Sequence, residues 1–234
     1  MNDLFLYNVQ LPLIIIINVF NIFALFLSFI IQYNENKIKK IHKYQKRELL
    51  KIYIYSIFWC ILFQYSLNYL IFLLYDYIII SKKFSFTNIY QALIIYFFDD
   101  LYFYFYHRML HENKFLYKYI HKMHHRSRSP YPINYIYANP LEIFFGTGGI
   151  VISILIQGQL YSFSLILYTS IKTIHEIYIH SGLFIHKDLY YFDIIGSSID
   201  HDIHHYYLKG NYGSNLNYLD KLFDTYITNK YIII

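Results

Sequence analysis

The sequence is poor in cysteine, glycine and charged residues. Its single cysteine, Cys60, has no partner within the chain, so intrachain disulfides are excluded as a source of stability. Charged residues make up 15% of the 234 residues and hydrophobic residues 56%, which excludes an ordinary soluble globular domain. The glycines at 210 and 213 are too few and wrongly placed for a dinucleotide-binding loop, so this chain is not expected to hold NAD(P)H itself.

Long runs without charge predict membrane-spanning helices, because crossing a hydrocarbon core takes roughly 20 apolar residues. Residues 4–34 contain no charged side chain, and Pro12 suits the first turn of a helix that runs to about Ile31. Residues 52–75 form a second run of this kind. Asp3 stands where a signal peptide would carry basic residues, and no small-residue cleavage site follows. We therefore expect the first helix to be retained.

The charge between these two runs predicts their orientation. Basic residues outnumber acidic ones there: Lys37, Lys39, Lys40, Lys43, Lys46, Arg47 and Lys51 stand against Glu35 and Glu48. Short loops rich in lysine and arginine stay in the cytoplasm, which places the N-terminus in the lumen. The net charge of +5 is then a signal of topology and of contact with lipid headgroups. No basic-aromatic recognition module accompanies it, so no nucleic-acid partner is expected.

Two further apolar segments predict how the chain continues. Residues 84–98 lead into Asp99 and Asp100 and would return the chain to the cytoplasm. Residues 143–171 are interrupted at 157–159, so each half is too short to cross comfortably. We expect a bent, re-entrant helical hairpin that enters and leaves by one face. The predicted fold class is an all-α integral membrane bundle with a cytoplasmic, histidine-rich cap.

Three histidine clusters lie in this second half: His107 with His111, His121 with His124 and His125, and His201 with His204 and His205. Residues three and four apart share a face of an α-helix, so the rings of each cluster are expected to point together. Neutral imidazole binds iron, zinc and copper, and eight imidazoles exceed the four ligands of one structural zinc. A dinuclear metal site follows. Zinc activating water, as in hydrolases, is one alternative, but the apolar setting favours iron that activates dioxygen towards a lipid C–H bond.

The three histidine clusters, called histidine boxes below, resemble in their order along the chain those of the fatty acid hydroxylase superfamily. These are membrane di-iron enzymes that include sterol desaturases, and the resemblance is strongest to the methylsterol monooxygenases among them. The resemblance covers residues 97–225. It is carried by these segments: Asp99-Asp100, His107-Arg-Met-Leu-His111, Tyr119-Ile-His121-Lys-Met-His124-His125, Pro130, Tyr137-Ala138-Asn139-Pro140-Leu141-Glu142, His180-Ser181-Gly182, His201-Asp202-Ile203-His204-His205, Gly210-Asn211-Tyr212-Gly213-Ser214, and Asp220 to Thr225.

This resemblance implies two iron ions held by the eight clustered histidines together with His180, and oxidation of a sterol methyl group by molecular oxygen. It implies a multi-pass protein of the endoplasmic reticulum membrane whose histidines face the cytosol. Electrons would come from NAD(P)H through a separate cytochrome b5-type carrier and its reductase. Residues 1–96 would form the N-terminal transmembrane helices with the basic loop, and residues 97–234 the catalytic domain with the re-entrant hairpin.

The sequence departs from the family pattern at two positions. Asn139 stands where the family usually has a histidine, so it is either a residue next to the ligands or a sign of an altered site. Asp200 replaces another histidine of many relatives and would orient a neighbouring imidazole through a hydrogen bond. His186, after the His-Ser-Gly triplet, is expected in a loop and not on the metal.

Several roles stay open at this point. Glu176 lies one helical turn before His180, where related hydroxylases often carry a histidine, and is either an oxygen ligand or a base beside the ligands. His175 is rotated off that face but remains a candidate ligand. Asp99, Asp100 and Asp202 would either orient imidazoles or be solvated residues.

The resemblance leaves alternative functions. One segment, Pro130-Tyr131-Pro132, resembles the corresponding sequence of desaturases. Three others resemble the methyl oxidases more closely: residues 138–142, 180–182 and 210–214. A sterol desaturase, a sterol side-chain hydroxylase and a fatty acyl or sphingolipid hydroxylase are therefore rivals at the same centre. A catalytically inert protein that binds metal or sterol is the alternative from another class, and Asn139 is the residue that favours it.

Overall fold

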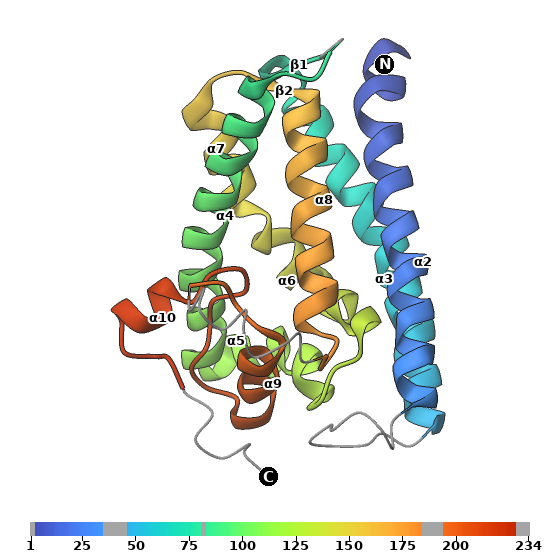
Figure 1. The fold of residues 1–234 in the computed structure, drawn as a ribbon, viewed down its shortest axis with the longest axis vertical. Helices are drawn as coiled ribbons and strands as arrows, with labels where there is room; N and C mark the ends of the chain where they lie inside the picture. Colours follow the sequence, from blue (N-terminus) through green and yellow to red (C-terminus); the bar gives the residue numbers. More distant parts are fainter. Residues whose placement is uncertain (1–2, 35–45, 81–82, 184–193, 228–234) are drawn as a thin grey trace.

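The computed structural model describes residues 3–34, 46–80, 83–183 and 194–227. Within them the chain is mostly helical, and long helices run along the vertical axis of Figure 1. Two short strands, β1 (Ile78–Ile79) and β2 (Leu160–Tyr161), pair in parallel, with Ile78 opposite Leu160. The predicted helical bundle is thus confirmed, and this small sheet corrects the purely all-α class.

The first helix begins earlier than the sequence predicted. A short α1 (Asp3–Phe5), a π-helical turn η1 (Leu6–Gln10) and α2 (Leu11–Tyr33) form one continuous helical segment of 31 residues. Pro12 lies in the first turn of α2 but inside that segment, so it does not begin the helix. Because Pro12 has no N–H to donate to the preceding turn, the wider π turn ahead of it accommodates the missing bond.

The second helix, α3 (Lys46–Leu73), contains most of the predicted second span and is followed by a 3₁₀ turn, η2 (Tyr75–Tyr77). Among the described residues, two helical segments are long and apolar enough to cross a membrane: Asp3–Tyr33 and Pro140–Gln157. α3 adds a shorter apolar stretch, Leu50–Leu62. Residues 35–45, most of the basic loop, lie outside the described residues, so its cytoplasmic position stays a prediction.

The next helix, α4 (Phe86–Glu112), is a single rod of 27 residues. Ser85 precedes it in a capping box with Asn88, which explains its sharp start. The predicted apolar segment 84–98 forms only the first part of this helix, which continues through Asp99 and Asp100 to Glu112. Both carboxylates are buried, so they point to partners inside the bundle and do not end the helix at a polar surface.

Four short helical segments follow: α5 (Lys114–Tyr119), η3 (His121–Arg126), η4 (Pro132–Ile136) and α6 (Pro140–Gly146). In Figure 1, α5 lies at the lower end and α6 lies higher, near the middle of the bundle. The first long helix holds this connection in place, because Ser28 Oγ of α2 accepts a hydrogen bond of 3.0 Å from the backbone N–H of Ile133. The second histidine cluster lies on η3, which is a 3₁₀ helix and not the expected α-helix.

The predicted hairpin consists of α7 (Gly148–Gln157), β2 and α8 (Ser162–Ile179). Its turn lies at Gly158, whose φ of +71° suits a residue without a Cβ. Because β2 pairs with β1, the tip of the hairpin lies at the upper end of the bundle in Figure 1, and α8 brings the chain back to the lower end. Passage of this hairpin in and out by one membrane face stays a prediction.

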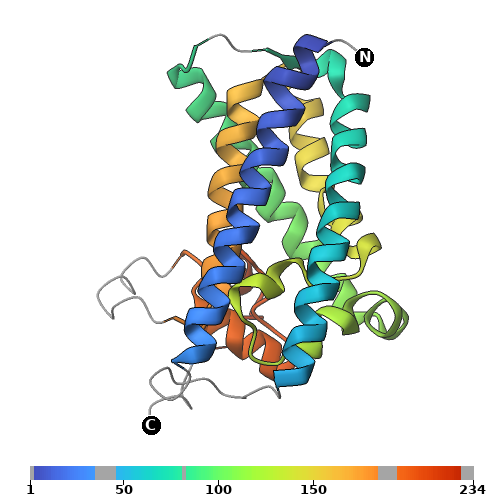
Figure 2. The same cartoon turned by 90° about the vertical axis from the view of Figure 1, so that its right-hand side faces the viewer.

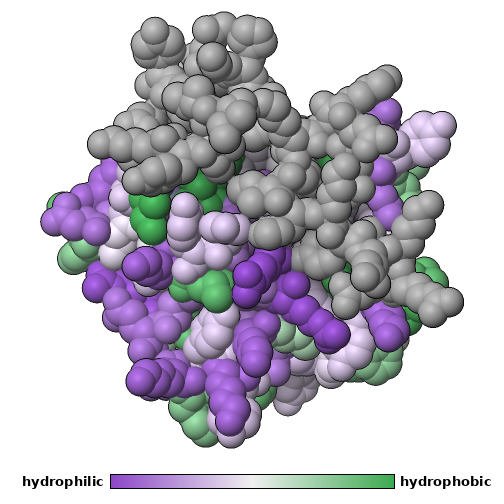
Figure 3. Space-filling model, turned by 90° about the horizontal axis from the view of Figure 1, so that it is seen from below, coloured by the Kyte–Doolittle hydropathy of each residue, from purple (hydrophilic) through white to green (hydrophobic). Residues whose placement is uncertain are grey.

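Two last helices, α9 (Ser198–Tyr207) and α10 (Tyr218–Leu222), lie at the lower end. In Figure 2, α2 (blue) and α3 (cyan) run nearly the length of the molecule, whereas α8 (orange) ends above the lower end. The outward faces of the long helices carry exposed apolar side chains, such as Ile22 and Phe26 of α2. Seen from below, the described part of the lower end is largely hydrophilic (Figure 3). An apolar flank and a polar end are what a membrane-embedded bundle requires.

Candidate metal centre

The histidines predicted from the sequence converge at the lower end of the bundle in two groups. Group one contains His107, His111, His121, His125 and His204, and group two contains His124, His180, His201 and His205. Within each group, one ring nitrogen per residue lies within 4.8 Å of all the others. All nine are buried except His111, which is partly buried. The structure therefore brings together every histidine predicted as a ligand, from α4, η3, the end of α8, and α9.

Each His-x-x-His-His box divides between the two groups. The first and last histidines of η3, His121 and His125, lie in group one, and His124 between them lies in group two. α9 does the reverse, because His204 is the member that lies in group one. In the α-helix α9, positions i and i+4 nearly overlay, whereas adjacent residues diverge by about 100°. η3 is a 3₁₀ helix, in which positions i and i+3 overlay, so this rule does not account for its division. The expectation that all three rings of a box point together is therefore wrong.

The nitrogen atoms of group one are very close together. His121 Nε2 lies 2.7 Å from His111 Nε2, 2.8 Å from His125 Nε2 and 3.1 Å from His107 Nε2. His204 Nε2 is buried and has no hydrogen-bond partner among the described residues. Bringing lone pairs this close is unfavourable unless a cation lies between them. The donor set therefore fits a metal ion.

Group two has the same construction. His201 Nε2 lies 3.0 Å from His180 Nε2 and 3.0 Å from His205 Nε2. The ring of His124 completes the group, with its centroid 4.7 Å from that of His205. Burial is the main cause that lowers the pKa of His124 to about 3, so its ring is neutral at pH 7. Neutral imidazole is the form that binds a metal.

Backbone carbonyls fix the opposite nitrogens of many rings. After α9, alternate carbonyls of one short segment accept hydrogen bonds from Nδ1 atoms of group one: Leu208 from His111 at 2.9 Å, Gly210 from His204 at 2.7 Å, and Tyr212 from His107 at 2.7 Å. Because a carbonyl only accepts, each Nδ1 carries the proton and each Nε2 keeps its lone pair. Gly210 lies in this segment at a φ of +68°, a conformation that favours glycine, and so shapes the turn after α9.

The Nδ1 atom of His121 is held by a carboxylate and not by a backbone carbonyl. Glu142 Oε1, from α6, lies 2.9 Å from His121 Nδ1, and the carboxylate is nearly buried. Sequence analysis missed this role, although Glu142 belongs to a segment that carries the family resemblance. The available signal was an acidic residue in the first turn of a helix that begins at Pro140. A carboxylate at this place fixes the ring tautomer and makes Nε2 a stronger ligand.

The remaining candidates lie around the two groups. His175 Nε2 contacts the backbone carbonyl of Ser214 at 3.1 Å, and the structure places His175 in neither group. Glu176 is not in a group either, but its Oε2 lies 3.8 Å from His180 Nδ1, beside the ligands. Asn139 is the N-cap of α6 and accepts a hydrogen bond from Leu141 N at 2.9 Å.

The aspartates have structural partners. Asp200 forms a capping box with Ser197 at the start of α9, and Asp202 is buried on the same helix. Asp99 Oδ2 lies 3.3 Å from Lys172 Nζ, and Asp100 Oδ1 accepts a hydrogen bond from Leu216 N at 3.1 Å. None of the four aspartates is exposed, which argues against the solvated alternative for Asp99, Asp100 and Asp202. His186 lies outside the described residues.

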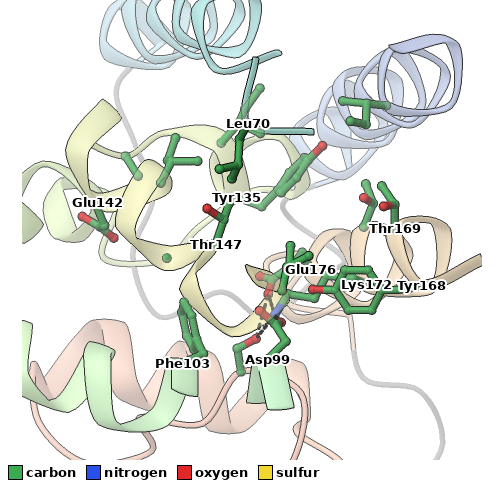
Figure 4. A pocket seen from close by; sticks show the side chains of 18 of the residues that line it. Leu70, Asp99, Phe103, Tyr135, Glu142, Thr147, Tyr168, Thr169, Lys172 and Glu176 are labelled. Carbon is green, nitrogen blue, oxygen red and sulfur yellow. Dashed lines mark hydrogen bonds and ion pairs between the residues drawn. The ribbon is translucent and has the colours of Figure 1, made fainter. Parts of the chain in front are cut away.

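A cavity in the bundle opens onto both groups. The histidines that line it are His107 from group one and His124, His180 and His201 from group two. The opposite part of the lining is apolar and comes from α3, α7 and α8, with Leu70, Ile71, Leu74, Ile150, Ile154 and Leu165. Figure 4 shows the polar wall of this cavity, where Asp99, Lys172 and Glu176 lie together. The cavity can therefore hold an apolar molecule with one end at the metal groups.

Comparison with known proteins agrees with this arrangement. The sequence profile named fatty acid hydroxylase matches residues 92–225, more than half of the chain and all nine grouped histidines. The chain belongs to the fatty acid hydroxylase family. The family region begins within α4 and ends after α10, so α2 and α3 lie outside it. No solved structure matches.

Among curated proteins this chain is similar to a methylsterol monooxygenase of Aspergillus fumigatus, with 35% identity over 61% of this chain and 49% of the relative. A putative methylsterol monooxygenase of Dictyostelium discoideum is 39% identical over 54% of this chain and 47% of the relative. Sphinganine C4-monooxygenase 1 of Arabidopsis thaliana is 37% identical over 53% and 46%, respectively. The chain spans about half the length of the curated relatives it matches.

Proposed function

We propose that this chain is a membrane di-iron monooxygenase that hydroxylates a methyl group at position 4 of a sterol. The observation that carries the proposal is the pair of buried histidine groups at the end of a cavity with an apolar lining. The similarity to methylsterol monooxygenases supports the choice of substrate. The two groups would each hold one metal ion, through the Nε2 atoms of the nine histidines.

The number of ligands supports iron over tetrahedral zinc. Group one offers five imidazole nitrogens, one more than the four ligands of a structural zinc ion. Imidazole is also a suitable ligand for iron. Two iron ions bound there would supply the activation of dioxygen.

The protein's own contribution is position and the exclusion of water. Backbone carbonyls and Glu142 hold the imidazoles in one tautomer, which keeps the ligands in place. The apolar lining from α3, α7 and α8 would hold the substrate body and keep water from the reacting carbon. Phe103, which lies in the cavity wall beside His107, would limit how closely the substrate approaches.

The surface supports a cytosolic position for the metal groups, in the membrane of the endoplasmic reticulum. Exposed basic residues gather around the histidine end: Lys114, Lys118, Lys122, Arg126, Arg128 and Lys209. Positive charge next to spanning helices favours the cytoplasmic side. It also suits an acidic electron donor of the cytochrome b5 type, which with its reductase would bring electrons from NAD(P)H.

Product analysis tests the proposal. The full chain, expressed in cells that lack their own 4-methyl oxidase and supplied with a labelled 4-methyl sterol, should yield the oxygenated methyl product. The variant His205→Ala, made in the same cells, is the matched control and should yield none. A new ring double bond with an intact methyl group would favour the desaturase reading. Stoichiometric zinc without oxygen uptake would favour an inert metal-binding protein.

Sphinganine hydroxylation is the second candidate, because the Arabidopsis relative is as similar as the methylsterol monooxygenases. The same cells should then be analysed for sphingoid bases. A hydroxylated sphingoid base with unchanged sterols would replace our choice of substrate while leaving the metal centre intact.

A further inference from the structure

The cavity that reaches the metal groups has a charged wall. Lys172 of α8 lies between two carboxylates, with its Nζ 3.3 Å from Asp99 Oδ2 and 3.0 Å from Glu176 Oε1. Figure 4 shows these three side chains together on one side of the cavity. Charged groups are costly in an otherwise apolar pocket, so a purely structural role would be better served by apolar residues.

This charged wall, formed by Asp99, Lys172 and Glu176, has more hydrogen-bond acceptors than donors. The ammonium of Lys172 has three N–H donors, and it meets three oxygens, the third being Ser214 Oγ at 3.0 Å. The Ser214 hydroxyl in turn donates to Glu176 Oε1 at 2.7 Å. Asp99 is only 2% exposed, and its carboxylate meets Lys172 and the hydroxyl of Tyr168. A carboxylate has about four lone-pair sites, so the two carboxylates can still accept a hydrogen bond from a ligand.

The charged wall lies close to the metal groups. Glu176 is one helical turn before His180, and its Oε2 is 3.8 Å from His180 Nδ1. The cavity continues from there into its apolar part, lined by residues such as Ile71, Leu74 and Ile154. A lipid that binds with its polar group at this wall therefore has its apolar body directed away from the metal. The carbon that reacts must then be close to the polar group.

We propose that the carboxylates of Asp99 and Glu176 bind a substrate hydroxyl group that is carried by the carbon next to the site of oxidation. This inference rests on the proposed function and deepens it, because the 3-hydroxyl of a 4-methyl sterol has this relation to the methyl group. A lipid with a ketone at that position offers only an acceptor and lacks the required donor. A lipid whose hydroxyl is remote from the reacting carbon cannot place the hydroxyl at the charged wall and the carbon at the metal groups together.

The test compares three 4-methyl sterols that carry a hydroxyl, a ketone or only hydrogen at carbon 3. The full chain in lipid vesicles is first assayed for equilibrium binding, by displacement of a fluorescent sterol. Turnover is then assayed with a reconstituted electron supply. A hydrogen bond to a charged acceptor predicts that the hydroxy sterol binds and reacts about 10- to 100-fold better than the other two. Equal binding of all three would overturn the inference.

Two variants make the assignment specific. In Asp99→Asn the new amide offers a donor, so the preference for hydroxyl over ketone should fall at least about tenfold while metal content stays unchanged. Asp100→Asn is the matched control, because Asp100 is also buried but bonds to Leu216 N and does not line the cavity. The preference of Asp100→Asn for the hydroxy sterol over the ketone should equal that of the wild type. An equal loss of this preference in both variants would contradict the inference.

The binding assay also separates this inference from the proposed function. If no sterol is oxidised but the hydroxy sterol still binds preferentially, the proposed activity fails and the hydroxyl site stands. If the methyl group is oxidised in all three sterols at equal rates and affinities, the activity stands and the hydroxyl site fails.

Discussion

The imidazole rings of His204 and His205 are perpendicular, at 90°, with their centroids 5.8 Å apart, although the two residues are adjacent in the chain. His204 belongs to group one and His205 to group two. The second box repeats this relation, with His125 in group one and His124 in group two. A pair of adjacent histidines on one helix therefore contributes one ring to each histidine group.

Removing either ring should affect one metal position more than the other. We expect His204→Ala to weaken metal binding in group one, and His205→Ala to weaken it in group two. Each variant should retain about one ion per chain, with different spectra, because different ligands remain. Metal analysis and absorption spectra check this. His175→Gln is the control, since His175 is in neither group and should retain both ions. Identical spectra for the two alanine variants would contradict the division of the histidines into two metal-binding groups.

Glu142 should strengthen the ligand that it holds. In Glu142→Gln the side chain keeps its shape but loses the carboxyl group, of which Oε1 lies 2.9 Å from His121 Nδ1. We expect metal affinity to fall by about 10- to 100-fold with little change in helix content. Competition with a chelator measures the affinity, and circular dichroism monitors the fold. An affinity equal to that of the wild type would show that the carboxylate does not act on the metal.

Asn139 should act on stability and not on the metal. Its side chain caps α6, and N-cap substitutions to alanine cost about 1 kcal/mol. We expect Asn139→Ala to lower the free energy of unfolding by that amount and to leave the metal content unchanged. Asn139→Asp, which preserves the cap, should be close to the wild type. Loss of metal in both variants would show that Asn139 acts on the metal centre, and would support the interpretation that the site is altered.

Acid should release the metal and destabilise the fold together. The pKa of His124 falls to about 3 on folding from an ordinary value of 6.5, so the unfolded chain takes up the proton first as the pH falls. The stability contributed by the neutral ring is therefore complete above about pH 6.5 and declines towards pH 3. Burial likewise lowers the pKa of His201 and His205. Metal content after dialysis between pH 8 and 4 tests this. Loss that begins above pH 7 would contradict it.

The sequence predicted the grouped histidines because their chemistry and spacing are local properties. It did not predict how the boxes divide, since η3 is a 3₁₀ helix and ring directions depend on packing against α4 and α9. Glu142 was missed because its partner His121 lies on a different element, and nothing local to either residue indicates the contact. The same reason applies to Asn139, whose cap appears only when the start of α6 is known. Asp99 and Lys172 likewise meet only through the packing of α4 against α8.

The sequence pattern also did not predict where the first helix begins or how far α4 extends. Pro12 is a common first-turn residue, and only the π turn ahead of it lets the helix extend back to Asp3. Asp99 and Asp100 resemble a helix end at a membrane surface, but buried partners on α8 and at Leu216 let α4 continue.

The most direct test of the account is the metal content of the purified full chain, loaded with ferrous iron without oxygen and then exposed to air with an electron supply. The two histidine groups predict two iron ions per chain and oxygen uptake that depends on both. One ion per chain, or tightly bound zinc with no oxygen uptake, would contradict a dinuclear iron centre.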